Sequence, residues 1–160
     1  MPAADPKVVD DIREHGWHVR MVSGDAIYPP FSYTVGLYAT FAHPELIVVG
    51  LPGDRAHRLL NEAGTLIRGG TTFQVGAVSD LLIPQYSCTF RAVPDVQFEY
   101  FLGAALQHYD GTRFPCLQLV WPARDHTWPW SDDATDGFRE QQRVLADSPV
   151  PPWPEPESEG

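Results

Sequence analysis

Residues 31–60 decide the fold of this chain, and they read FSYTVGLYATFAHPELIVVGLPGDRAHRLL. From Phe31 to Leu37, large apolar residues alternate with small ones, and this period of two predicts a β-strand. Residues 45–51 are mostly apolar, which is typical of a strand that is covered on both faces. Asp54 is a favoured helix N-cap, and apolar residues follow it at helical spacing. The stretch therefore predicts a strand, a turn, a second strand and a helix.

The sequence on both sides of this stretch adds further elements. Asp5-Pro6 opens a predicted helix, because Asp caps a helix well and Pro suits its first position, and Gly16 ends it. Periodicity predicts further strands at residues 17–22, 73–77, 85–92 and 114–121, and further helices at residues 94–109 and 138–145. This order predicts an α+β fold with a mixed, mostly antiparallel sheet of about six strands and roughly two to three main helices.

The last part of the chain differs in composition from the rest. Residues 147–160 are rich in proline and in acidic residues. Such a composition cannot bury enough apolar surface to offset the entropy lost on ordering. We therefore predict one α+β domain over residues 1–146 and a disordered, acidic, Pro-rich tail over residues 147–160.

Charge and cysteine content exclude several classes of protein. The net charge is −10, and Lys7 is the only lysine among 11 basic residues. Nucleic acids and anionic membranes are both bound through clusters of Lys and Arg, so neither is an expected partner. Cys88 and Cys116 are too few for a disulfide framework, and the N-terminal residues lack the apolar run of a signal peptide. We expect a cytoplasmic protein.

Familiar catalytic and metal-binding motifs are absent from the sequence. It contains no Gly-rich phosphate loop, no Gly-x-Ser-x-Gly elbow and no His-Glu-x-x-His. Its six histidines are dispersed and no Cys-x-x-Cys occurs, whereas zinc needs three or four converging ligands. We therefore expect no metal and no bound cofactor, apart from the flavin alternative given below.

A few polar residues stand out as candidates for a site. His43 lies in the loop between two predicted strands, where it can act as a general base or can bond a backbone carbonyl and order the loop. Gln118 lies within an apolar strand, so its amide must reach a ligand or a neighbouring backbone group. Asn61 sits poorly in a helix, and it either bonds a loop or serves a ligand. Tyr33 and Trp121 are candidate pocket walls.

The candidates can be assembled into one predicted pocket. It would lie between the strand at residues 33–37, the His43 loop and the strand at residues 118–121. We assign catalytic candidacy to His43 and Tyr33. The predicted ligand-binding residues are Tyr33, Thr34, His43, Asn61, Gln118 and Trp121.

Several short motifs also resemble those of a known family. They are Tyr33-Thr34-Val35-Gly36-Leu37, His43-Pro44-Glu45-Leu46, Gly50-Leu51 and Gln118-Leu119-Val120-Trp121-Pro122. In this order they resemble the bacterial family catalogued as domain of unknown function 4262, from Ile12 to Trp130. The resemblance implies a shared fold and transfers no catalytic role. Where the family has Trp-Pro-Asp, this chain has Ala123 in place of the acid, so a role for that acid has no support here.

These features favour a small-molecule-binding protein, and they leave open whether it is also a metal-independent enzyme. One alternative is a protein–protein interaction module without catalysis. Another is a homodimer similar to the flavin-reductase-like split barrels, which bind flavin mononucleotide. In that case the phosphate would be bound by one of the arginines Arg20, Arg55, Arg58 and Arg68.

Overall fold

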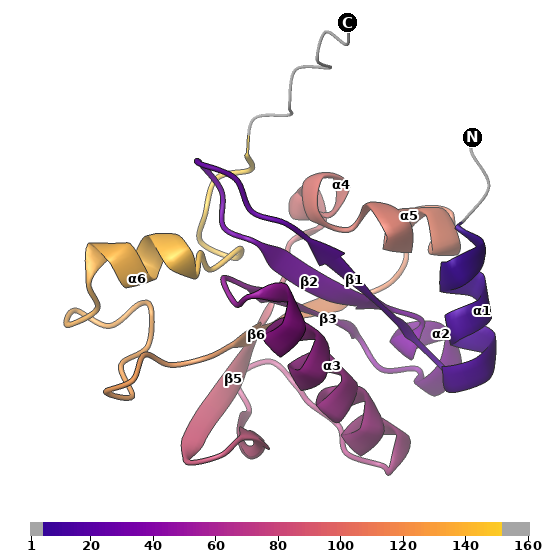
Figure 1. Ribbon diagram of the computed structural model, residues 1–160, viewed down its shortest axis with the longest axis horizontal. Coiled ribbons are helices and arrows are strands. Elements are labelled where there is room, and N and C mark those ends of the chain that lie inside the picture. The colour runs from indigo at the N-terminus through magenta and orange to yellow at the C-terminus, as the bar shows by residue number, and fades with distance from the viewer. Residues whose placement is uncertain (1–4, 152–160) are drawn as a thin grey trace, which may run out of the picture.

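The computed structural model describes residues 5–151, which form a single α+β domain (Figure 1). Within this range a six-stranded mixed sheet has the order β1-β2-β3-β6-β5-β4. Strands β3 and β6 are parallel, and all other neighbours are antiparallel. The predicted fold class is therefore confirmed. The strands are β1 His18–Val22, β2 Phe31–Val35, β3 Glu45–Val49, β4 Val78–Ile83, β5 Tyr86–Ala92 and β6 Cys116–Val120.

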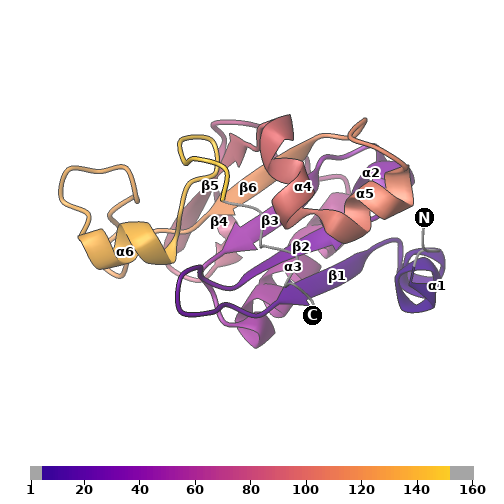
Figure 2. The same ribbon diagram turned by 90° about the horizontal axis from the view of Figure 1, so that it is seen from above.

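Helices cover both faces of the sheet, and Figure 2 shows α3 and the pair α4–α5 on opposite sides of it. The helices are α1 Pro6–His15, α2 Leu37–Phe41, α3 Gly53–Arg68, α4 Phe98–Phe101, α5 Gly103–Tyr109 and α6 Asp136–Gln141, with a 3-10 turn η1 at Asp95–Gln97. Asp5 caps α1 as predicted, because its side chain accepts a hydrogen bond from the backbone N–H of Lys7.

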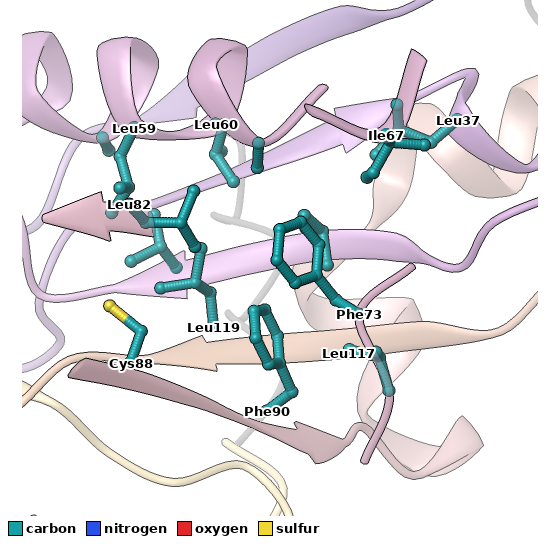
Figure 3. Close-up of a cluster of buried hydrophobic side chains, with 14 of the residues drawn as sticks. Leu37, Leu59, Leu60, Ile67, Phe73, Leu82, Cys88, Phe90, Leu117 and Leu119 are labelled. Carbon is teal, nitrogen blue, oxygen red and sulfur yellow. The ribbon is translucent and has the colours of Figure 1, made fainter. Parts of the chain in front are cut away.

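The helix α3 forms the larger of the two apolar cores. Its apolar stripe faces the sheet, where α3 packs mainly on β1 and β2, and its side chains form one buried cluster with those of β5 and β6 (Figure 3). The buried residues on the helix side are Ala56, Leu59, Leu60, Ala63 and Ile67, and those on the sheet side include Cys88, Phe90, Leu117 and Leu119. Each fully buried leucine or phenylalanine contributes about 1.5–3 kcal/mol, so this layer accounts for much of the stability.

A second core fills the opposite face of the sheet. There α1, α4 and α5 cover the odd-numbered residues of β2 and β3, and the C-terminal part of the chain adds Leu145. Phe31, Tyr33 and Val35 share this face, as the period of two predicts, because successive side chains of a strand alternate. Leu37 was predicted on the same face, but it belongs to the α3 core, since the strand ends at Val35 and α2 begins at Leu37.

The predicted strand at residues 73–77 is wrong. Phe73 is buried, but Val75 is exposed and the segment turns: the N–H of Ala77 donates to the carbonyl of Gln74 at 3.0 Å. The strand that pairs with β5 is instead β4, which begins at Val78. The three apolar residues with a period of two are therefore two that contact the core, Phe73 and Ala77, and one on the surface, Val75.

Two predicted helices have different limits. The helix predicted at residues 94–109 is broken at Leu102, whose φ of −119° and ψ of 41° separate α4 from α5. The helix predicted at residues 138–145 ends at Gln141, and the chain then runs irregularly along the domain. Both deviations matter below, because the break at Leu102 and the segment after Gln141 position polar groups.

The predicted boundary between domain and tail falls inside the described part of the chain. Asp147 donates its N–H to the carbonyl of Val144 at 3.0 Å, and the Gln97 amide donates to the carbonyl of Ser148 at 3.0 Å. Pro151 is buried. Residues 152–160 of the predicted tail lie outside the described residues.

Candidate functional site

A cleft of about 340 Å³ lies between the β1–β2 edge of the sheet and the helices α4 and α5. We name it the Tyr33 cleft, because the Tyr33 ring is the most deeply buried polar side chain on its surface. Its lining residues are Asp5, Arg20, Val22, Phe31, Tyr33, Tyr100, Phe101, Gly103, Ala104 and Gln107.

The floor of the cleft consists of two cross-strand pairs. The register of β1 and β2 places Arg20 directly opposite Tyr33, and Val22 directly opposite Phe31. Directly paired residues project from the same face of an antiparallel sheet, with Cβ atoms about 4.5–5.5 Å apart. The guanidinium of Arg20 and the hydroxyl of Tyr33 therefore extend from one point of the sheet into the same cleft.

The wall of the cleft consists of α4 and the first turn of α5. The Phe101 ring meets the Phe31 ring edge to face, with centroids 4.9 Å apart. The helix break at Leu102 turns the chain, and the N–H of Ala104 then donates to the Tyr33 hydroxyl oxygen at 2.9 Å. The side chain of Gln107 is exposed at the rim. The phenol of Tyr33 thus joins the floor to the wall.

The polar groups of the cleft are mainly hydrogen-bond donors. Burial raises the pKa of the Tyr33 phenol, so the hydroxyl keeps its proton at neutral pH. The hydroxyl oxygen accepts a hydrogen bond from the N–H of Ala104. No group among residues 5–151 accepts the hydroxyl hydrogen. Arg20 has an ion-pair partner in Asp5 at 3.6 Å, and both side chains are about half exposed.

A second and larger hollow lies on the opposite face of the sheet. It measures about 700 Å³ and lies over the outer side of α3 and Met21 of β1. It is wide open to solvent, and its lining side chains are mostly charged or polar residues from one helix, so it encloses a ligand less well than the Tyr33 cleft does. The lining residues are Met21, Asp54, His57, Arg58, Asn61, Glu62 and Thr65.

Asn61 is the predicted site residue that lines this second hollow. Its side-chain oxygen accepts a hydrogen bond from the Trp17 indole at 2.8 Å, and its amide nitrogen lies 3.3 Å from the His57 ring. The bond to Trp17 ties α3 to the start of β1. Asn61 therefore has a structural partner and lies on the other face of the sheet from Tyr33.

Thr34 belongs to a buried polar cluster around Glu45. The Glu45 carboxylate is completely buried and accepts hydrogen bonds from the Thr34 hydroxyl at 2.7 Å and from the Tyr109 hydroxyl. It also accepts from the backbone N–H groups of Gly36, Leu37 and Tyr38, at 2.9, 3.2 and 3.1 Å. We name these six residues the Glu45 cluster.

The Glu45 cluster fixes α2 against the sheet. Burial raises the pKa of Glu45, while the hydrogen bonds from Tyr109, Thr34 and the backbone oppose that rise. Burial and the neighbouring Glu45 also raise the pKa of Tyr109.

Gly36 of the cluster has a φ of 117°, and a Cβ there would lie 2.8 Å from the carbonyl oxygen of Gly16. Sequence reasoning missed Glu45, although an acid at the start of an apolar strand was a signal that a buried partner set was needed.

His43 is buried, and both of its ring nitrogens have partners. Nδ1 lies 2.8 Å from the Pro44 carbonyl and so carries the proton, and Nε2 accepts the N–H of Phe73 at 2.9 Å. Burial lowers the pKa of the ring, which favours this neutral form. The imidazole thus joins the loop before β3 to the segment after α3, and it has no nitrogen left for a substrate in this state.

Gln118 and Trp121 bind the C-terminal segment, residues 141–151. The Gln118 side chain donates to the carbonyl of Arg143 and accepts the N–H of Leu145, both at 2.8 Å. The Trp121 backbone is bonded in the same two-way manner by the side chain of Gln142, at 2.9 and 2.6 Å. The side-chain amides of Gln118 and Gln142 thus satisfy backbone groups of the C-terminal segment and of Trp121, as a neighbouring strand does within a sheet.

A third buried amide completes the attachment of this segment. The Gln97 side chain donates to the carbonyls of Leu145 and Ser148, both at 3.0 Å. Its oxygen is buried and has no hydrogen-bond partner, the one such side-chain atom found in the part of the chain that the structure describes.

The six predicted ligand-binding residues are therefore not brought together. Tyr33 lines the cleft and Asn61 the opposite hollow. Neither of these two cavities is lined by the other four, which bond to protein groups: Thr34, His43, Gln118 and Trp121. Residues that sequence reasoning did not assign to a pocket with Tyr33 are the ones that surround it: Arg20, Phe31, Tyr100, Phe101 and Gln107.

The candidates for binding charged groups are also separated. Of the arginines considered for a flavin phosphate, Arg20 lines the Tyr33 cleft and Arg58 the opposite hollow, while Arg68 stacks on Trp17 at 5.0 Å. No group of three or more His, Cys, Asp or Glu side chains able to hold a metal ion occurs among residues 5–151. Within the same range, no helix is both long and apolar enough to cross a membrane.

Comparison with known proteins gives one match. The family model described as "Domain of unknown function (DUF4262)" matches residues 11–135, which is more than half of the chain. No curated protein matches. No solved structure matches either.

Proposed function

The chain belongs to the family described as domain of unknown function DUF4262, and because that description assigns no activity, we propose from geometry that it is a small-molecule-binding protein whose site is the Tyr33 cleft. One observation carries the proposal. In this cleft the Tyr33 hydroxyl hydrogen has no acceptor among residues 5–151 and the Arg20 ion pair with Asp5 is 3.6 Å long, whereas the other predicted ligand-binding side chains are hydrogen-bonded within the protein.

The size and chemistry of the cleft fit this role. Small-molecule sites usually measure about 300–1,000 Å³ and combine apolar walls with a few polar groups that orient the ligand. The Tyr33 cleft, at about 340 Å³, lies at the small end of this range. Phe31 and Phe101 supply the apolar surface, and Tyr33, Arg20 and Gln107 supply the polar groups. A ligand of one ring, or of similar size, is the best fit.

The lining residues support binding more directly than catalysis. No His, Cys, Ser or Thr lines the cleft. The carboxylate that does, Asp5, caps α1 and pairs with Arg20, so it is poorly placed to act as a general base. Tyr33 remains the catalytic candidate of this site, as a proton donor rather than as a base, because its pKa is raised.

The proposal can be tested by filling the cleft. A fragment library would be screened by protein NMR against the wild type, against Ala104→Trp in the cleft wall, and against Thr65→Trp as a matched control in the opposite hollow. We expect fragments that shift the amide signals of Arg20, Ala104 and Gln107, and we expect Ala104→Trp alone to abolish those shifts. Fragments that bind equally well to Ala104→Trp, or a complete lack of binders, would contradict the proposal.

A protein-interaction module is the second candidate function. Three exposed apolar side chains, Val75, Val78 and Leu81, lie on the edge strand β4 or just before it. Exposed strand edges can pair with another chain, and a homodimer is one form of such pairing. Light scattering after size exclusion would test it: a dimer that Leu81→Lys converts to a monomer supports this candidate, and a wild-type monomer contradicts the homodimer.

A further inference from the structure

The charges around the Tyr33 cleft indicate which ligands it accepts. Arg20 is the one basic residue in its lining, and its guanidinium carries five N–H donors of which Asp5 can use two at most. Because Arg20 and Tyr33 are cross-strand partners, the guanidinium and the phenol hydrogen can converge on a single acceptor. Two donors from neighbouring strands, one of them charged, suit an anionic oxygen pair.

The acidic residue of the cleft is already in use. The Oδ1 atom of Asp5 accepts the N–H of Lys7 at 2.9 Å and so caps α1, where the positive end of the helix dipole stabilises its charge. Its Oδ2 atom lies 3.6 Å from Arg20, which is longer than a well-formed charge-assisted hydrogen bond. Ion pairs of this length and exposure contribute little, so a ligand anion can replace Asp5 at the guanidinium.

Apart from Tyr100 and Gln107, the remaining lining of the cleft is apolar. Val22 and Phe31 continue the floor beyond the Arg20–Tyr33 pair, and Phe101 stands edge-on to Phe31. Such a surface binds the flat or branched body of a small organic molecule, since rings favour offset or edge-to-face contact. A free inorganic anion would leave this surface without a contact.

From these three observations, and resting on the proposed function, we infer that the ligand is a small organic monocarboxylate with an aromatic or branched apolar body. Its carboxylate pairs with the Arg20 guanidinium and accepts the Tyr33 hydroxyl hydrogen. Its body lies on Val22, Phe31 and Phe101. A single cation limits the site to one anionic group, which disfavours dicarboxylates and nucleotides.

Three probes of the same shape and different charge test the inference. Phenylacetate, phenylacetamide and phenethylamine would be titrated into the full chain, with affinity measured by NMR shift changes. We expect phenylacetate to bind at least about tenfold more tightly than the other two, because a charge-assisted contact is roughly twice as strong as a neutral one. Dependence of phenylacetate binding on Ala104→Trp places it in the cleft.

Two variants sharpen the test, because one removes the positive charge of the cleft and the other removes its negative charge. Arg20→Gln removes the cation and should weaken phenylacetate binding about tenfold or more, while phenylacetamide binding changes less than about twofold. Asp5→Asn removes the competing carboxylate and keeps a favoured N-cap, so it should strengthen phenylacetate binding several-fold. Both side chains are about half exposed, so neither change threatens the fold.

Each result has a distinct meaning. Equal affinity for phenylacetate and phenylacetamide would overturn the carboxylate inference and leave the proposed function standing. Preferred binding of phenethylamine, with Asp5→Asn weakening it and Arg20→Gln strengthening it, would show that the cleft takes cations and would overturn the inference in the same way. No cleft binding by any of the three probes would overturn the inference, and the fragment screen described above would then decide the proposed function separately.

Discussion

Two polar regions meet at β2, and they differ in whether their hydrogen bonds are complete. Thr34 belongs to the Glu45 cluster, where the carboxylate is completely buried and receives five hydrogen bonds. Its neighbour Tyr33 faces the cleft. There the Tyr33 hydroxyl and the Arg20 guanidinium have N–H or O–H groups that make no hydrogen bond to residues 5–151. The comparison teaches that complete networks hold this fold together, and that incomplete ones beside a cavity are the better candidates for a site.

The largest effect should come from emptying the Glu45 cluster. Glu45→Ala removes the acceptor of three backbone N–H groups and two hydroxyls, all of them buried or partly buried. Each buried donor left without a partner costs about 1–3 kcal/mol, so we expect a loss of about 3–5 kcal/mol once the local structure relaxes. Urea unfolding would measure it. Glu62→Ala, at an exposed position of α3, serves as the control and should stay within about 0.5 kcal/mol of the wild type.

A smaller but clear loss is expected for Gln118→Leu. The change leaves the carbonyl of Arg143 and the N–H of Leu145 without partners, so stability should fall by about 1–3 kcal/mol. The same substitution at the cleft, Gln107→Leu, alters an exposed amide and should change stability by less than about 0.5 kcal/mol. Equal losses for the two glutamines in chemical unfolding would break the distinction between the closed network and the cleft.

His43→Ala should destabilise by a similar amount and should also change the pH dependence of stability. The N–H of Phe73 loses its acceptor, which costs about 1–3 kcal/mol. The folded pKa of His43 lies below its unfolded value, so the unfolded chain binds more protons in the interval between the two pKa values. The stability that neutral His43 contributes is therefore complete above pH about 6.5 and decreases as the pH falls toward the folded pKa.

The difference between wild type and His43→Ala isolates this pH effect. Their unfolding free energies would be compared from pH 7.5 down to the acid limit of folding, with His57→Ala, an exposed histidine, as the control. We expect the gap between wild type and His43→Ala to narrow as the pH decreases. A gap that is constant with pH would mean that folding does not lower the pKa of His43.

Apart from the control substitutions, the smallest effect on stability is expected for Tyr33→Phe. The N–H of Ala104 loses its acceptor, but it lies beside the cleft, where water can replace the phenol oxygen, so the loss should be about 0.5–1.5 kcal/mol. Phenylacetate binding should weaken several-fold in the same variant. A loss as large as that of Glu45→Ala would place Tyr33 among the residues that hold the fold and not at a site.

Much of the fold could be predicted from sequence because its strands and α3 have regular periods. Tyr86 to Ala92 alternate over a full strand, and the buried stripe of α3 repeats every three to four residues. Phe73 to Ala77 have the same alternation without a partner strand, which three residues cannot reveal. The break at Leu102 is followed directly by Gly103, a poor helix former, and sequence reasoning overlooked this local signal.

The candidate site could be predicted only in part, because it depends on register and on distant partners. Gln118 was correctly identified as an amide that must be paired, but its partners lie about 25 residues further along the chain. Arg20 and Tyr33 meet only because β1 and β2 pair in one register, and a slip of one residue would turn Arg20 to the other face. Glu45 was hidden in an apolar run, since the donors it binds are mostly backbone groups that every sequence has.

The pairing of Gln118 with residues 143 and 145 also affects the order in which the newly made chain can complete its hydrogen bonds. On the ribosome Gln118 is added 25 residues before Arg143. Because ribosomes add about 5–20 residues per second, the two residues are made on the order of one to five seconds apart. During that interval β6 can pair with both β3 and β5, but the buried side-chain amide of Gln118 has no partner. The hydrogen bonds of Gln118 are therefore completed only when the segment beyond α6 has emerged, and a pause in translation within that segment would prolong the time for which this buried amide stays unpaired.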